Sequence, residues 1–377
     1  MNVTSFKAGK NVQRYQYKSF EPNIVDMPWQ IDNAELNMLL SIANIKMGEL
    51  NAYSQLIPDV DFFIKMHVLK EGTKSSRIEG TQTNIDEAIQ KAEYIKDDKK
   101  EDWQEVQNYV QAMNHAIENL EKLPLSNRLL KETHSILLQG VRGTHKLPGE
   151  FRQSQNWIGG SSLIDATFIP PHQDSVADLM ADLERFLHND NTPVPHLIKI
   201  GIAHYQFETI HPFLDGNGRI GRLLITLYLV SNHLLHKPTL YLSDFFERNK
   251  SLYYENLNRV RNHNDLTQWL KYFLEGVRST SENAIQTFKH IIQIRTEVEH
   301  KIISLGKKQA LAKSFLQFLY GKPITDANDV AKDLNINIST ALRLIEDFIK
   351  LEILIEVTGF KRNRIFAFDD YIKLFRS

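Results

Sequence analysis

The sequence contains no cysteine, and this absence excludes several kinds of chemistry at once. Disulfide bonds, thiolate zinc sites, iron–sulfur clusters and cysteine nucleophiles all require that residue. Long apolar runs are missing as well, because no stretch approaches the roughly 18 apolar residues of a membrane-spanning helix. The polar, basic segment Met1 to Lys18 does not resemble a signal peptide. We therefore expect a cytoplasmic protein without membrane contact, whose chemistry comes from histidine, carboxylates, hydroxyls and backbone groups.

Neither sign of charge is in excess. The 45 Lys and Arg residues stand against 46 Asp and Glu residues, for a formal net charge of -1. Such a chain has no overall basic field that would hold nucleic acid, so any contact with DNA would have to be local. Its 377 residues are 42% hydrophobic and 24% charged, which excludes widespread disorder and predicts two or three folded units.

Apolar spacing predicts a mainly α-helical protein, interrupted at three places. The first 30 residues carry Pro22 and Pro28 and should form an extended arm. Gly80 should end a helix, and a capping signal at Thr83 should start the next one. Glycines and prolines break up residues 144–171, where a short β-hairpin around Gly159 and Gly160 is expected. Helical spacing covers residues 33–56, 60–72, 103–120, 123–140, 174–188, 195–208 and 269–305.

The last 71 residues, 307–377, have the element order of a winged helix–turn–helix domain, with three helices followed by two strands. Its predicted recognition helix, residues 339–350, has a net charge near zero. Only the wing is basic, through Lys361, Arg362 and Arg364. Because few phosphates would be neutralised, DNA is the less favoured partner, and docking to protein or support of a homodimer is favoured.

The strongest chemical signal is the segment HPFLDGNGRIGR at residues 211–222. Gly216 and Gly218 permit a tight loop that opens a helix, and such a loop presents backbone N–H groups and the positive end of the helix dipole to an anion. Arg219 and Arg222 could add contacts to phosphate. No Gly-Lys-Ser/Thr follows the glycines, so the loop is not a Walker P-loop.

Two further residues of this segment complete a reaction centre. The Asp215 carboxylate is a hard oxygen ligand suited to Mg²⁺, and His211 is a base that titrates near neutral pH. Together with the anion site they indicate metal-assisted phosphoryl or nucleotidyl transfer. Taken alone, His211 would ordinarily be interpreted as a structural histidine and Asp215 as a turn residue.

The same string matches the HPFx(D/E)GNGRxxR signature of the Fic family at every defined position, so the chain resembles a Fic-family protein adenylyltransferase. The resemblance implies a helical Fic core with a β-hairpin flap, and transfer of AMP from ATP to a Ser, Thr or Tyr hydroxyl of a target protein or of the chain itself. His211 would be the general base and Asp215 the Mg²⁺ ligand. Asn217, backbone N–H groups and Arg219 would bind the α- and β-phosphates, and Arg222 the γ-phosphate.

A second motif, Ser75, Glu79 and Gly80 in SSRIEG, fits the (S/T)xxxE(G/N) inhibitory pattern of the family. By this resemblance Glu79 would pair with Arg222, block the productive pose of the γ-phosphate and leave a weakly active enzyme. In some relatives the glutamate also supports removal of AMP. The nucleotide site implied overall comprises Glu79, Phe213, Leu214, Asp215, Gly216, Asn217, Gly218, Arg219, Arg222, Tyr253, Tyr254 and Asn262.

Two regions are assigned by resemblance alone. The segment around residues 157–168 resembles the flap that aligns the target through backbone hydrogen bonds, although an ordinary surface hairpin would look the same. Tyr253, Tyr254 and Asn262 stand where relatives contact adenine, although a tyrosine pair at helical spacing often has a ring in the core. The residues expected to dock the target are Ile158, Gly159, Gly160, Thr167 and Phe168.

The expected organisation is an N-terminal helical region (residues 1–102), a Fic core (103–280), a helical connector (281–306) and the winged-helix domain (307–377). Two other functions remain open. The chain could be a nucleotide-binding transcriptional or toxin–antitoxin-like regulator that acts through its winged helix. It could also be a Fic enzyme that transfers UMP, phosphate or phosphocholine, although Gly216 favours AMP over phosphate.

Overall fold

The computed structural model describes residues 1–57, 60–191, 193–359 and 363–376. It confirms a mainly α-helical fold with few, short strands. The helices of the N-terminal region and core are α1 (Ala34–Leu56), α2 (Val60–Ile78), α3 (Ile85–Ala88), α4 (Lys100–Asn119), α5 (Asn127–Leu137), α6 (Gln173–His188), α7 (His196–Ile210), α8 (Asn217–Ser231), α9 (Ser243–Arg248), α10 (Lys250–His263) and α11 (Leu266–Ile303). Single 3₁₀ turns lie at Val3–Ser5, Ala92–Tyr94, Asp97–Lys99 and Gly306–Lys308.

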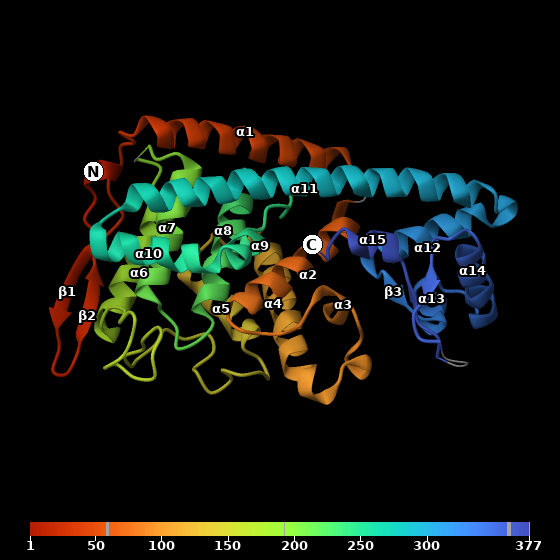
Figure 1. The fold of residues 1–377 in the computed structure, drawn as a ribbon, viewed down its shortest axis with the longest axis horizontal. Helices are drawn as coiled ribbons and strands as arrows, with labels where there is room; N and C mark the ends of the chain where they lie inside the picture. Colours follow the sequence, from red (N-terminus) through yellow and green to blue (C-terminus); the bar gives the residue numbers. More distant parts are fainter. Residues whose placement is uncertain (58–59, 192, 360–362, 377) are drawn as a thin grey trace.

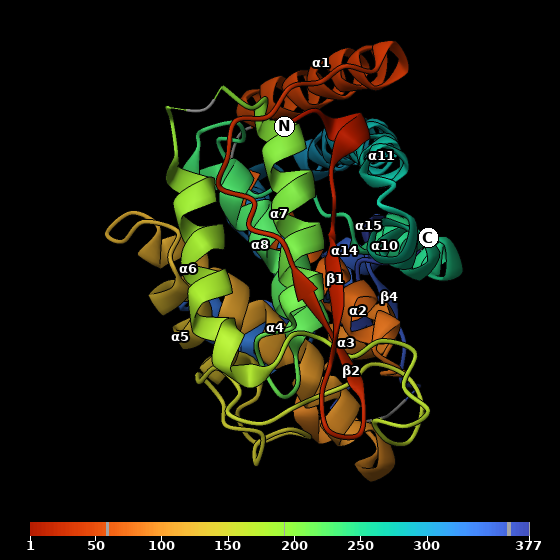
Figure 2. The same ribbon diagram turned by 90° about the vertical axis from the view of Figure 1, so that its left-hand side faces the viewer.

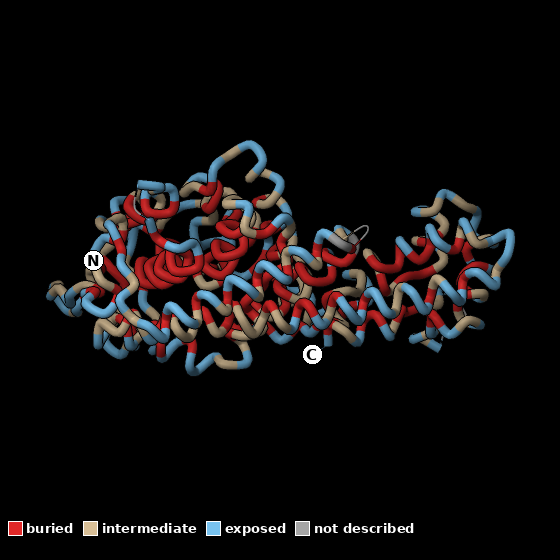
Figure 3. Tube along the Cα trace, turned by 90° about the horizontal axis from the view of Figure 1, so that it is seen from above, coloured by how far each residue is buried: buried red, intermediate tan, exposed pale blue. Residues whose placement is uncertain are grey.

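The long helix α11 runs along most of the molecule, and α1 packs beside it (Figure 1). Helix α11 has 38 residues and continues across residue 280, the predicted boundary between core and connector. The predicted core and connector therefore share one continuous helix. Helices α7 and α8 lie beneath it at the centre of the core, where every residue of α7 after His196 is buried (Figure 3). Consequently the loop between α7 and α8 is fixed at both ends by buried helices. No helix of the described residues is long and apolar enough to cross a membrane.

The N-terminal arm is extended as predicted, but it also pairs with itself. Strands β1 (Gly9–Gln13) and β2 (Lys18–Pro22) form an antiparallel hairpin in which Val12 faces Ser19 (Figure 2). Several hydrogen bonds fasten the arm to the core. Among them, Phe20 N–H donates to Ile169 O at 2.9 Å, and Ala8 N–H donates to Asn264 Oδ1 at 2.8 Å. The arm therefore braces the segment expected to form the flap.

The region of the second motif differs from the sequence prediction in two details. Helix α2 continues beyond residue 72 to Ile78, so Ser75 lies within a helix, and Gly80 follows with φ +109° in agreement with its predicted role as a stop. The next helix is capped by Asn84 rather than Thr83. Asn84 accepts from Glu87 N–H, and Glu87 accepts from Asn84 N–H, which forms a complete capping box.

The C-terminal unit contains α12 (Gln309–Gly321), β3 (Ile324–Thr325), α13 (Ala327–Asp333), α14 (Ile338–Lys350), β4 (Ile355–Glu356), β5 (Phe366–Ala367) and α15 (Asp369–Lys373). Its antiparallel strands are ordered β3-β5-β4. Three helices and then a strand pair follow one another in the predicted order. Of the three basic wing residues, Lys361 and Arg362 lie outside the described residues, and Arg364 forms an ion pair with Glu356 at 2.6 Å.

Candidate active site

The segment 211–222 forms a tight loop that opens helix α8. Helix α7 ends at Ile210, and His211 takes a left-handed backbone conformation with φ 50°. Gly216, with φ 72°, occupies the N-cap position of α8, a conformation that favours glycine over residues with a side chain. The loop thus leads directly into the first turn of α8, where N–H groups lack a partner within the helix. Binding of an anion there stays a prediction.

Side chains within and behind the loop hold its shape. Asn217 Oδ1 accepts from Phe213 N–H at 2.8 Å, and Asn217 Nδ2 donates to Phe213 O at 2.8 Å. The Phe213 ring is fully buried and stacks on His134, with ring centroids 3.8 Å apart. The Phe213 side chain therefore belongs to the core and not to a ligand site. Asn217 braces the loop, and its contact with phosphate stays a prediction.

His134, which the sequence did not single out, supports the loop from α5. Its Nδ1 accepts from Gly149 N–H at 2.8 Å, so its Nε2 carries the proton and donates to Asp215 O at 3.0 Å. Burial lowers the pKa of His134 to about 4, which keeps the ring neutral in this arrangement. The backbone of Asp215 is thereby fixed while its carboxylate remains partly exposed.

The backbone of His211 is held from the other side. Arg152 Nε donates to His211 O at 3.0 Å, and Asn156 Nδ2 donates to the same oxygen at 3.2 Å. Arg152 holds a second segment as well, because its Nη2 donates to Pro171 O at 2.6 Å. Burial, followed by the charge of Arg261, lowers the pKa of His211 to about 3, so the imidazole is neutral and able to accept a proton.

The predicted contact between the two motifs is present. Arg222 Nη2 donates to Glu79 Oε1 at 2.7 Å and to Ser75 O at 2.9 Å, and Arg222 Nε donates to Ser75 Oγ at 2.9 Å. The Arg222 side chain is 1% exposed, whereas Glu79 is 36% exposed. Burial opposes ionisation of Glu79, but the charge and hydrogen bond of Arg222 outweigh it, and the pKa of Glu79 lies below its usual value.

The Glu79 carboxylate also lies against the first turn of α8. A Cβ atom at position 218 would stand 2.3 Å from Glu79 Oε1, so glycine is required there for this close approach. A helix N-terminus and an adjacent arginine are the features that attract a phosphate. Glu79 therefore places its anionic group beside both of these features.

Arg219 is anchored by a carboxylate on a distant helix. Its Nη1 donates to Glu105 Oε2 on α4 at 3.4 Å, and its Nη2 lies 3.6 Å from Asp215 Oδ1. Arg142 binds the other oxygen of Glu105 at 2.8 Å. Glu105 had no motif around it, and only the folded chain brings it to the loop.

The loop offers one carboxylate for a metal ion. Among the described residues no group of three or more His, Asp or Glu side chains could hold a metal by itself. Mg²⁺ is commonly held by one or two carboxylates together with substrate phosphates, so the single, 39% exposed Asp215 side chain fits such a site.

Beneath the loop lies a second, fully buried polar layer. Glu208 carries an Oε1 atom without a hydrogen-bond partner among the described residues, and burial raises its pKa to about 7. His204 Nδ1 contacts Gly221 O at 2.8 Å, and its Nε2 contacts Tyr253 Oη at 2.9 Å.

These contacts correct the expectation for Tyr253. The ring is 1% exposed and packs on Phe246 at 4.5 Å, so it cannot stack on an adenine. Tyr254 is 37% exposed and Asn262 is exposed near the end of α10, so both remain predictions for the adenine contact.

The flap is simpler than predicted. Ile158 and Phe168 form one antiparallel bridge, with N–H···O distances of 2.8 and 3.1 Å. The bridge joins the two segments that the sequence predicted to pair. Gly159 and Gly160, with φ 68° and 71°, open the connection to Thr167, and a Cβ atom at Gly160 would stand 2.4 Å from Asp165 O. Asp165 organises that connection by accepting from Ser161 and Ser162 N–H. Arg261 stacks on the Phe168 ring at 3.8 Å and so ties the flap to α10.

The sequence patterns of known families match two adjacent parts of the chain. The Fic/DOC family N-terminal pattern matches residues 37–118, and the Fic/DOC family pattern matches residues 124–229, which include the loop. The chain belongs to the Fic/DOC family. Proteins named "Protein adenylyltransferase Fic" from Drosophila melanogaster and Drosophila yakuba are 26% and 27% identical to this Fic/DOC protein over 209 residues. The match covers 53% of this chain but only 39% of the length of these relatives.

Solved structures support the fold of this Fic/DOC protein. A Fic family protein from Desulfovibrio desulfuricans superposes with a TM-score of 0.57 at 21% identity, covering 90% of this chain and 98% of that one. A Fic domain containing signaling protein from Bacteroides thetaiotaomicron gives a TM-score of 0.55 at 18% identity, covering 67% of this chain and 97% of the other. The helical architecture is therefore shared well beyond the loop.

Proposed function

We propose that this Fic/DOC protein is an autoinhibited protein adenylyltransferase. It would transfer AMP from ATP to a Ser, Thr or Tyr hydroxyl of a target protein or of itself and release pyrophosphate. The observation that carries the proposal is the 2.7 Å contact between Glu79 and Arg222 at the mouth of the loop. The names of the Drosophila relatives support the adenylyl group as the one transferred.

The first step is binding of the triphosphate at the loop. The N–H groups at the start of α8 favour an anion, and Arg219 and Arg222 add charge-assisted contacts. Asp215 would hold a Mg²⁺ ion, which when bound neutralises part of the phosphate charge. Because Glu79 already engages Arg222 and lies against Gly218, its carboxylate repels the phosphate that would contact the same groups.

The second step is proton transfer from the target hydroxyl to His211. The neutral imidazole accepts the proton as the hydroxyl oxygen bonds to the α-phosphorus, and the bond from that phosphorus to pyrophosphate breaks. Arg152 and Asn156 fix the backbone of His211 and so fix the direction of its ring. The flap around Phe168 would hold the target segment beside this ring.

A labelling experiment tests the proposal. We expect Glu79→Gly to incorporate AMP from ATP labelled at the α-phosphate at least about tenfold faster than the wild type, since a hydrogen bond to a charged group is worth roughly 1.5–3 kcal/mol. Glu79→Gln, which keeps the size but not the charge, should fall between them. Adding His211→Ala to Glu79→Gly should abolish the label.

Two results would overturn the assignment. Equal labelling by wild type and Glu79→Gly would remove the inhibitory role of Glu79, and labelling that survives His211→Ala would require another base. A parallel reaction with α-labelled UTP separates AMP transfer from UMP transfer. An operator footprint that is insensitive to His211→Ala would instead favour a transcriptional regulator.

The C-terminal unit supports a protein partner more than a DNA partner. The exposed residues of α14 include Ile338 and Leu342, which are 50% and 41% exposed. Phosphate contacts need cations on such a helix, and apolar side chains supply none. We expect no shift of duplex DNA by the purified protein in an electrophoretic mobility assay at physiological salt.

A further inference from the structure

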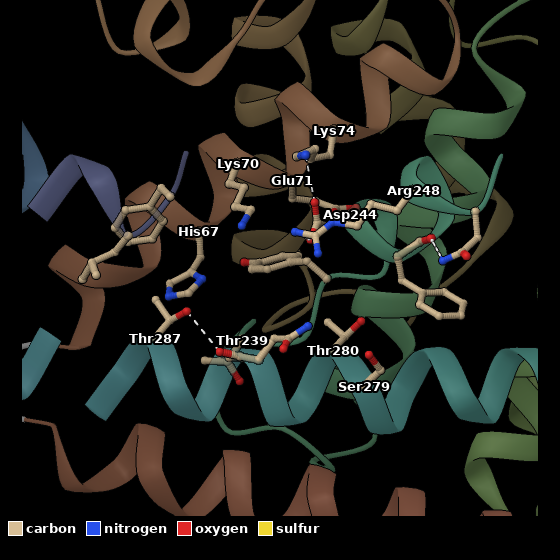
Figure 4. A pocket seen from close by; sticks show the side chains of 17 residues that line it. His67, Lys70, Glu71, Lys74, Thr239, Asp244, Arg248, Ser279, Thr280 and Thr287 are labelled. Atoms are coloured by element: carbon tan, nitrogen blue, oxygen red, sulfur yellow. Dashed lines mark hydrogen bonds and ion pairs between the residues drawn. The ribbon is translucent and has the colours of Figure 1, made fainter. Parts of the chain in front are cut away.

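A cavity of about 260 Å³ lies where α2, α9, α11 and the end of the chain meet. Figure 4 shows α2 along one side of it and α11 along the other, with Lys70 and Arg248 directed into the space between them. No residue of the loop 211–222 lines it. Four α2 residues, His67, Lys70, Glu71 and Lys74, line it, on the helix that leads to Glu79.

The wall of this cavity gathers positive charge. Asp244 forms ion pairs with two cations: its Oδ1 lies 2.9 Å from Lys74 Nζ, and its Oδ2 lies 2.8 Å from Arg248 Nη2. Lys70 adds a third cation. Burial lowers the pKa of Lys70, and although Asp244 raises it, the positive charges of Lys74 and Arg248 lower it further. Two carboxylates, Asp244 and Glu71, line the cavity too, and Glu247, outside the lining, lies 3.5 Å from Lys74. The lining residues thus hold three cations against two carboxylates, which favours an anion.

Two buried polar groups in the wall have no partner of their own. Within the described part of the chain, neither His67 Nε2 nor Tyr241 Oη has a hydrogen-bond partner, and these residues are only 8% and 7% exposed. Both line the cavity. A buried donor or acceptor left unpaired costs roughly 1–3 kcal/mol, so such groups are normally satisfied by water or a ligand. Their position indicates a polar occupant.

The side formed by α11 is uncharged and polar. Ser279, Thr280 and Thr287 lie there, opposite the cations of α2 (Figure 4), and Asn283 also lines the cavity. Cations on one side and hydroxyl and amide groups on the other match a ligand that carries an acidic group on a hydroxylated body.

We propose that this cavity binds a small hydroxylated organic anion, a phosphate or carboxylate, and that the bound anion fixes α2 against α9. Such a ligand would contact Lys70 and Lys74 on α2 and Arg248 on α9 at the same time. Lys74 lies five residues before Glu79, about 7.5 Å along a helix. Fixing α2 at this point would keep Glu79 on Arg222, a consequence that rests on the proposed function.

Calorimetric titration of the full chain tests the binding. Glucose 6-phosphate and gluconate share a hydroxylated carbon skeleton and differ in the acid group, and glucose is the neutral match. We expect at least one of the two anions to bind and glucose to bind at least about tenfold more weakly. Arg248→Gln, at a half-exposed side chain, should weaken binding of the anion about tenfold, whereas Arg219→Gln in the loop should not.

Three results would overturn the site: no binding of either anion, equal binding of glucose, or an unchanged affinity in Arg248→Gln. The outcome for the two anions decides between a phosphate and a carboxylate ligand.

Hydrogen exchange separates the effect on α2 from the enzymatic activity. The anion that binds should slow amide exchange in residues 66–80, and unchanged exchange there would overturn the fixing of α2. The same anion should lower AMP labelling by the wild type and leave Glu79→Gly unaffected. If Glu79→Gly transfers no AMP at all, the proposed function fails, yet the exchange result still decides this inference.

Discussion

The two ends of helix α2 are attached to the rest of the molecule by different forces. Its first half packs through aromatic rings on the C-terminal unit, where Phe63 lies 4.7 Å from Tyr320 and 6.3 Å from Tyr371. Its second half reaches the loop through polar contacts from Ser75, and Glu79 follows directly after the helix. In the proposed mechanism, only the second contact is replaced by another anion.

Under the proposed function, α2 would be held permanently at its first half and released at its second. Buried apolar packing is lost only when neighbouring elements separate, whereas a carboxylate on an arginine competes directly with phosphate. The C-terminal unit would thus keep α2 in place while Glu79 exchanges with a ligand. The comparison predicts that changes in the first half alter stability most and that changes in the second half alter activity most.

The largest expected effect is on stability, from Phe63→Ala. Phe63 is 1% exposed, and truncating a buried phenylalanine costs about 3–5 kcal/mol. We expect the midpoint of urea unfolding to fall accordingly. Tyr15→Ala, at a side chain that is 96% exposed, is the matched control and should leave the midpoint nearly unchanged. Equal midpoints for Phe63→Ala and the wild type would contradict the packing of α2 on the C-terminal unit.

The next effect concerns Glu71, which lies between the two halves. Burial raises its pKa from 4.5 to about 7, although Ser243 and the charge of Arg222 act in the opposite direction. The folded state therefore binds more protons than the unfolded state between these values, and stability falls as the pH rises from 4.5 to about 7. The loss amounts to about 3 kcal/mol and levels off at higher pH.

Urea unfolding at a series of pH values measures this loss. Glu71→Gln should remove about 3 kcal/mol of the pH dependence, because its side chain does not ionise. Glu255→Gln, at an exposed position on α10, should retain the wild-type dependence. If Glu71→Gln keeps the full dependence, Glu71 is not the buried titrating group between the two halves of α2.

The sequence predicted the reactive segment well because its determinants are local. The spacing of His211, Asp215 and the two glycines specifies a loop followed by a helix, and the structure has that loop. The partners that support it were not predictable in this way. His134 binds Asp215 across 81 positions, and Glu105 binds Arg219 across 114, so neither contact leaves a pattern in the chain.

The differences between prediction and structure at the helix cap, the tyrosine pair and the flap have physical causes. Thr83 and Asn84 are both good capping residues, and only the reciprocal bonds between Asn84 and Glu87 decide between them. Helical spacing could not show which tyrosine of the pair faces the core. Tyr253 faces it, and its hydroxyl forms a hydrogen bond with His204 Nε2 there. The pairing of Ile158 with Phe168 was predicted, whereas the role of Asp165, which accepts from Ser161 and Ser162 N–H, was not.

The smallest effect is expected from Ser75→Ala, in the second half of α2. This change removes the acceptor of Arg222 Nε but leaves the contacts of Arg222 with Ser75 O and Glu79. We expect AMP labelling to rise by a few fold, less than in Glu79→Gly, since one hydrogen bond of a charged donor is weakened while the carboxylate stays. The measurement is the initial rate of labelling from α-labelled ATP.

Ser76→Ala provides the control for that measurement. Ser76 is also fully buried on α2, but among the described residues its Oγ has no hydrogen-bond partner. The two variants remove the same atom from neighbouring positions, so any general loosening of the helix affects both. A rise in labelling confined to Ser75→Ala would place the restraint in the bond to Arg222. An equal rise in both variants would show that packing along α2, and not its polar end, restrains the site.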